Sequence, residues 1–139
     1  MQSLRNLGAL LVLVAAGTAG CRNASQAPAL KELQRAHSGA LNVVLLAGAD
    51  TLQRGKGSFV VEFRGADGSL VDVGTVSISA TMAMPGMAPM FGDTVATATA
   101  TTGRYEVTSD FGMAGTWRIR AEWNGPAGRG STSLAGTVT

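Results

Sequence analysis

Hydrophobic and polar residues alternate along much of the chain after residue 40, and the alternation is clearest in two segments. In Thr75–Met82, valine, isoleucine, alanine and methionine share one face, while serine and threonine share the other. In Thr116–Trp123, tryptophan, isoleucine and alanine alternate with threonine, arginine and glutamate. A period of two residues predicts a β-strand with one buried face and one solvated face.

Weaker forms of this pattern recur, separated by glycine-rich turns such as Gly65–Gly68. The seven predicted strands are Leu41–Leu46, Ser58–Arg64, Thr75–Met82, Val95–Ala100, Arg104–Ser109, Thr116–Trp123 and Ser131–Val138. Seven short strands with frequent turns favour an all-β, immunoglobulin-like antiparallel β-sandwich. A closed barrel is the alternative. We expect this β-domain to cover residues 40–139.

The segment before these strands has a different pattern. Leu30 and Leu33 lie three residues apart within Ala29–His37, a spacing that gives a short helix a small apolar face. We therefore expect about two turns of helix there, within a tether that covers residues 21–39. So short a helix is marginal without packing.

The N-terminus has the three parts of an export signal. Arg5 is followed by the apolar run Leu7–Ala16 and then by small residues, as in a secretory signal peptide. The apolar stretch Leu7–Ala19 has 13 residues, whereas a spanning helix needs about 20. We expect residues 1–20 to be a signal peptide.

The ending Thr18–Cys21 (TAGC) resembles the bacterial lipobox, although Thr18 stands where leucine is usual. The resemblance implies that the thiol of Cys21 is acylated and becomes the mature N-terminus. Stable membrane anchoring takes more than one acyl chain, and lipoprotein processing supplies more than one. The alternative is a secretory peptide cleaved nearby, which would leave a free thiol.

Composition excludes several kinds of function. The 11 lysines and arginines are dispersed, and the net charge is only +2, which argues against nucleic-acid binding. Beyond Cys21 there is no cysteine, so the domain has no disulfide and no thiolate ligand. His37 is the only histidine and lies in the tether, so a serine–histidine–aspartate set is possible only if His37 joins it. We expect no enzyme activity.

Methionines form the one cluster with chemical potential. Met82, Met84, Met87 and Met90 lie within nine residues, and Met113 lies in another glycine-bounded loop. Thioethers are soft, uncharged ligands that select soft cations, above all Cu(I). If successive strands alternate in direction, the two loops open at the same end of the sandwich. These five methionines are therefore our candidate Cu(I) or Ag(I) ligands.

Two other interpretations of the methionines stay open. Met82 continues the inward face of its strand, so it could be a core residue, since methionine often fills irregular gaps in a core. The loop could also be an apolar surface that docks a partner protein without metal.

The remaining candidates are weaker. Trp117 and Trp123 share a strand face, which indicates core positions. Asp93 and Asp110 flank the methionine loops and fit turn or edge roles. The glutamates on outward strand faces are expected to be solvated charges that favour solubility: Glu62, Glu106 and Glu122.

Three short motifs carry a family resemblance. Thr81–Met90 (TMAMPGMAPM), then Gly103–Tyr105 (GRY), then Met113–Trp117 (MAGTW) resemble the YtkA-like/FixH-like domain family in order and spacing. The resemblance covers about Leu41–Val138. It implies an immunoglobulin-like sandwich outside the cytoplasmic membrane and an association with copper handling. Envelope metal-transport or oxidase-assembly proteins are the partners it implies.

Two features depart from that family. FixH-type proteins are usually held by a transmembrane helix, whereas this chain has a lipobox. Many relatives carry a histidine beside the Met-Pro segment, where Ala88 and Pro89 stand here, so a site in this chain would use thioethers alone. We expect a lipid-anchored extracytoplasmic binding module on the periplasmic face of the inner or outer membrane.

Overall fold

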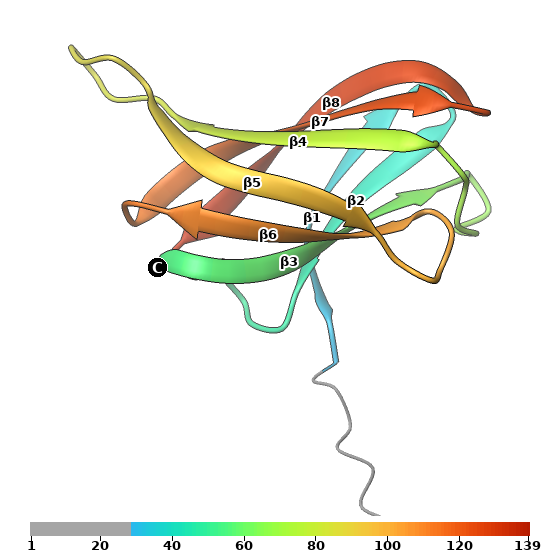
Figure 1. Cartoon of the computed structure of the whole chain (residues 1–139), viewed down its shortest axis with the longest axis horizontal. Coiled ribbons are helices and arrows are strands. Elements are labelled where there is room, and N and C mark those ends of the chain that lie inside the picture. Colours follow the sequence, from blue (N-terminus) through green and yellow to red (C-terminus); the bar gives the residue numbers. More distant parts are fainter. Residues whose placement is uncertain (1–28) are drawn as a thin grey trace, which may run out of the picture.

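The computed structural model describes residues 29–139, which form eight β-strands and no helix (Figure 1). The strands are β1 Lys31–Ser38, β2 Leu41–Ala47, β3 Gly55–Arg64, β4 Thr75–Met82, β5 Met90–Ala98, β6 Arg104–Phe111, β7 Gly115–Gly125 and β8 Gly128–Val138. No helix long and apolar enough to span a membrane occurs in this part of the chain. The expected signal peptide and Cys21 lie outside the described residues.

All strands belong to one antiparallel sheet with the order β1-β2-β3-β6-β5-β4-β7-β8. β5 pairs with both β4 and β6 and so joins the two layers (Figure 1). The sheet curls until its outer strands approach, and Ser38 Oγ on β1 donates to the carbonyl oxygen of Ser131 on β8 at 3.5 Å. The predicted all-β, sandwich-like class is confirmed, with eight strands in one continuous sheet.

The helix expected at 29–37 is wrong, because this segment is strand β1. It pairs with β2 from Lys31 opposite Ala47 to Ser38 opposite Leu41, with an irregularity between Glu32 and Gln34. Only Leu33 and Ala36 of β1 pack against the core, so the strand lacks the alternation that identifies its neighbours. Ladder hydrogen bonds to β2 override the weak helical pattern. The folded part thus begins within the segment predicted to be a tether.

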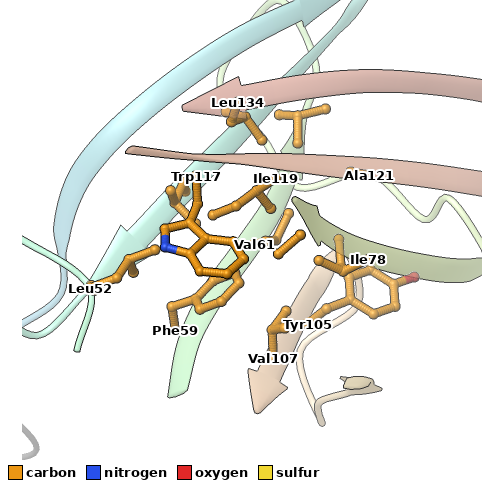
Figure 2. Packing of buried hydrophobic residues seen from close by; sticks show 14 of the residues in the cluster. Leu52, Phe59, Val61, Ile78, Tyr105, Val107, Trp117, Ile119, Ala121 and Leu134 are labelled. Carbon is orange, nitrogen blue, oxygen red and sulfur yellow. The ribbon is translucent and has the colours of Figure 1, made fainter. Parts of the chain in front are cut away.

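The core between the layers is rich in aromatic rings (Figure 2). Trp117 and Trp123 are buried on the inward face of β7, as predicted. The rings of Trp117 and Phe111 have centroids 5.0 Å apart. Phe63 contacts both Tyr105 and Trp123 edge-to-face, at 5.6 and 5.3 Å. Such pairs add to the stabilisation that burial of the rings provides.

Glu62 corrects the expectation that outward glutamates are solvated, because its side chain is only 2% exposed. Arg104 donates to one carboxylate oxygen from Nε and Nη2 at 2.9 and 2.6 Å, and Arg64 donates to the other. Burial, the largest single influence, acts to raise the pKa of Glu62. The hydrogen bonds from Arg104 and Arg64 outweigh it and hold this pKa below its ordinary value.

Close contacts hold together the end of the sheet at which β4 and β6 begin. Tyr105 donates its hydroxyl hydrogen to the carbonyl of Gly74 at 2.6 Å. Gly103 has a φ of 84°, and a Cβ there would lie 2.7 Å from the carbonyl oxygen of Val71. Both contacts tie the segment between β3 and β4 to the start of β6.

Candidate functional site: a methionine-rich end of the sheet

Met82 ends β4 and Met90 begins β5, and the two residues are direct cross-strand partners. Both side chains are half-buried and pack against the hydrophobic core. Met82 therefore packs against the core, as one interpretation of the sequence held, but its side chain is only partly buried. Cross-strand partners have neighbouring side chains, so two thioethers lie side by side where the hairpin leaves the sheet.

β5 starts at Met90, earlier than the predicted start at Val95. Its inward face uses small residues because large rings already fill the space. A Cβ on Gly92 would lie 3.1 Å from Phe111 and 3.3 Å from Trp117. The usual signal of large inward residues is therefore missing from the first half of this strand.

The turn between β6 and β7 lies against these two methionines. A Cβ on Gly115 would lie 2.5 Å from Met82 Cε and 3.5 Å from its Sδ. A Cβ on Gly112 would lie 3.7 Å from Met90 Sδ. Met113 sits between the two glycines, so the two loops meet at one end of the sheet, as the predicted alternation of strand directions requires (Figure 1).

Met113 is held by its backbone and free at its side chain. The buried indole of Trp117 donates from Nε1 to the carbonyl oxygen of Met113 at 3.0 Å. The side chain of Met113 stays exposed, with 39% of the residue accessible. The Met113 side chain can therefore change rotamer, and so move its sulfur, without a change in the backbone of the turn.

The hairpin between β4 and β5 extends beyond the body of the molecule (Figure 1). Its tip is a tight turn in which Met84 accepts a backbone hydrogen bond from Met87 N at 3.1 Å. Pro85 and Gly86 occupy the two central positions, and Gly86 has a φ of 73°. This is the residue pattern of a type II turn. Met84 is half-buried, whereas Met87 is 68% exposed.

The outer face of β5 carries apolar residues that the sequence pattern did not single out. Phe91 is 74% exposed and Val95 is 62% exposed. Both have the parity opposite to the inward Met90, Gly92 and Thr94. The sequence does hold a signal for their outward position. If the strand is taken to start at Met90, its alternation puts Phe91 and Val95 on the outer face. Asp93 shares this outer face and separates Phe91 from Val95. We refer to the three exposed apolar residues Met87, Phe91 and Val95 as the apolar strip.

The two segments that carry the methionines contain no ionisable side chain, although Asp93, Asp110 and Arg118 border them directly. Neither 81–92 nor 111–117 contains aspartate, glutamate, histidine, cysteine, lysine or arginine. Within residues 29–139, no group of three or more His, Cys, Asp or Glu side chains is placed to hold a metal ion. The side-chain donors that these two segments supply are thioethers and the hydroxyls of Thr81 and Thr116.

Of the predicted ligands, the structure brings Met82, Met90 and the backbone of Met113 together at the base of the hairpin. It places Met84 and Met87 further out, at the tip. His37 lies exposed on β1. Asp93 and Asp110 are direct cross-strand partners on β5 and β6, a strand position rather than a turn.

These features define a small, sandwich-like β-domain with a methionine hairpin at one end. The profile of the YtkA-like family matches residues 36–122, and the chain belongs to this family. The match begins within β1 and ends in β7, so it contains every methionine of the hairpin and the turn. No significant match was found among curated proteins or among solved structures.

Proposed function

We propose that the protein is an extracytoplasmic binding module that holds Cu(I) or Ag(I) through methionine thioethers. The observation that carries the proposal is the convergence of Met82, Met90 and the turn of Met113. The half-buried thioethers of Met82 and Met90 lie side by side. The methyl group of Met82 packs against Gly115, and the sulfur of Met90 lies beside Gly112. The exposed side chain of Met113 starts between these two glycines and supplies a third sulfur.

The chemistry of the donor set supports a soft monovalent cation. Thioethers are neutral, and a site without carboxylates favours soft ions over zinc, calcium or magnesium. Half-burial restricts water at the site, and the fixed backbone of Met113 lowers the entropy lost when the third sulfur binds. We infer that Met82, Met90 and Met113 hold the ion, and that Met84 and Met87, at the hairpin tip, lie outside this holding set.

The proposed lipid at Cys21 would keep the domain close to a membrane. Ten residue steps separate Cys21 from Lys31, the start of β1, and an extended chain of that length spans at most about 35 Å. Envelope metal-transport or oxidase-assembly proteins within that reach would be the partners of such a module. Lipidation is tested by mass spectrometry of the membrane-extracted protein, compared with a Cys21→Ser variant.

Metal binding is tested by titrating Cu(I) against a calibrated chelator in a Cys21→Ser background, where no thiol competes. We expect one tightly bound ion per chain, weakened when Met82, Met90 or Met113 is replaced by leucine. Leucine keeps the bulk of the side chain, and such exchanges cost under about 1.5 kcal/mol of stability. A wild-type chain that binds no Cu(I), or leucine variants that bind as tightly, would contradict the proposal.

A second candidate function is supported by the apolar strip of Met87, Phe91 and Val95. These three residues expose large apolar side chains on the hairpin and the strand that follows it, and a docked partner would cover them. In that case the hairpin docks an envelope protein without metal, and leucine at position 87 preserves the contact. Metal titration of the leucine variants therefore separates the two candidates.

A further inference from the structure

The methionines at this end of the sheet fall into two groups that differ in position: Met82, Met90 and Met113 lie at the base of the hairpin, and Met84 and Met87 lie at its tip. Met82 and Met90 are half-buried against the core, and the glycines of the β6–β7 turn contact them. Met87, at the hairpin tip, is 68% exposed. Met84 is half-buried, so the tip presents one exposed thioether and one partly shielded thioether.

The hairpin tip holds its two methionines in a fixed relation. Met84 and Met87 are the first and fourth residues of the turn, joined by the hydrogen bond from Met87 N to Met84 O. The first and fourth residues of a β-turn have Cα atoms within about 7 Å. Pro85 restricts the turn further, because proline fixes φ. The two side chains therefore start from backbone positions close enough for both sulfurs to reach one ion, at the projecting tip of the hairpin (Figure 1).

Only a short length of chain separates the outer pair, Met84 and Met87, from the inner methionines Met82 and Met90. Met84 follows Met82 by two residues, so their Cα atoms lie at most about 7 Å apart. No other metal-ligating side chain lies between them along the chain, since the segment from 83 to 89 contains only Ala, Met, Pro and Gly. A soft cation at the tip meets only thioethers before it reaches Met82 and Met90.

We propose, on the basis of the function proposed above, that Met84 and Met87 are transfer ligands through which a soft cation enters and leaves the inner site. The ion moves by ligand exchange: a bond to an inner sulfur breaks as a bond to Met84 or Met87 forms. The tip sulfurs then yield the ion to thioether, thiolate or imidazole donors of an acceptor protein. The ion keeps its charge throughout, and no electron or proton is transferred.

The experiment measures binding and release separately, in the full chain with Cys21→Ser. Cu(I) is loaded, and its removal by bathocuproine disulfonate is followed over a range of chelator concentrations. The double variant Met84→Leu/Met87→Leu is compared with the matched control Met90→Leu, which changes one inner ligand. Equilibrium affinities of all three proteins are measured in parallel.

We expect the double variant to keep its affinity within about threefold and to release Cu(I) about tenfold more slowly. Its release rate should also lose the dependence on chelator concentration that the unmodified tip shows, because the chelator can no longer capture an ion at the tip. Met90→Leu should lower the affinity without slowing release.

Three outcomes overturn the inference. Equal release rates in the double variant and the wild type would show that the tip takes no part in exchange. An affinity loss as large as that of Met90→Leu would make Met84 and Met87 holding ligands. If the wild type binds no Cu(I), the proposed function fails and the transfer role fails with it, whereas either of the first two results leaves metal binding intact.

Discussion

Met82 and Gly115 are in direct contact across the methionine end, with the methyl group of Met82 occupying the space where a side chain at position 115 would begin. A Cβ on Gly115 would lie 2.5 Å from Met82 Cε, and the φ of Gly115 is 140°. We predict that Gly115→Ala displaces Met82 and destabilises the fold by about 1–3 kcal/mol. Urea denaturation measures the loss, and the chemical shift of the Met82 methyl group reports the displacement.

Gly112→Ala is the matched control, because a Cβ there would meet Met90 Sδ at 3.7 Å, an ordinary contact distance. We expect it to change stability by less than about 0.5 kcal/mol and to leave the Met82 signal in place. If both variants lose the same stability, the contact between Met82 and Gly115 does not constrain this end. If Cu(I) binds, Gly115→Ala should weaken it more than Gly112→Ala does.

Cu(I) affinity should be independent of pH between about 5 and 8, because thioethers carry no proton in that range and need none removed. A histidine or cysteine ligand would instead bind more weakly as the pH falls. The measurement is a chelator titration at pH 5, 6.5 and 8 in the Cys21→Ser background, with the chelator calibrated at each pH. A tenfold loss of affinity at pH 5 would show that a titrating group joins the site.

Glu62 should make stability depend on acid pH. Its pKa in the folded protein lies below the ordinary value of 4.5. Its contribution is therefore fully present above pH 4.5 and is lost as the pH falls through the lower folded value. Glu62→Gln removes charge-assisted hydrogen bonds to Arg64 and Arg104, and we expect it to cost about 1–3 kcal/mol at pH 7.

The test for Glu62 compares urea denaturation of the wild type and Glu62→Gln at pH 7 and pH 3. Other carboxylates contribute equally to both proteins, so the difference between them isolates Glu62. That difference should shrink at pH 3. A constant difference would mean that the variant acts through packing and not through the ionised carboxylate.

The apolar strip should contribute little to the fold, because Phe91 and Val95 face solvent. We predict that the double variant Phe91→Ser/Val95→Ser changes the free energy of unfolding by less than about 1 kcal/mol. Under the docking alternative, the same variant loses association with envelope complexes while Cu(I) binding is unchanged. A large loss of stability would show that these side chains support β5 instead of a partner.

Much of the fold was predictable because burial on one face of a strand leaves a visible pattern. The predicted segment Thr75–Met82 has the observed bounds of β4, and Thr116–Trp123 lies within β7. β1 was not predictable, since few of its residues face the core and the polar rest resembles a helix. The start of β5 was hidden because Phe111 and Trp117 occupy its inward side and leave room only for glycine opposite them.

The candidate site was predictable in outline, because the alternation of strand directions alone puts both methionine loops at one end. The sequence pattern could not separate the inner methionines from the outer ones, since that division depends on where β5 begins. The contacts with Gly112 and Gly115 depend on tertiary packing across 20 or more residues. Arg104 reaches Glu62 across 42 residues for the same reason, so the burial of that carboxylate carries no local signal.

β5 is hydrogen-bonded to β4 on one side and to β6 on the other. The hairpin that carries Met90 and the turn that carries Met113 are therefore spaced by a continuous ladder, with no flexible connection between them. The spacing of the backbone positions that carry these sulfurs is set by the curvature of the sheet. It does not depend on the loops at the far end, between β3 and β4 and between β5 and β6.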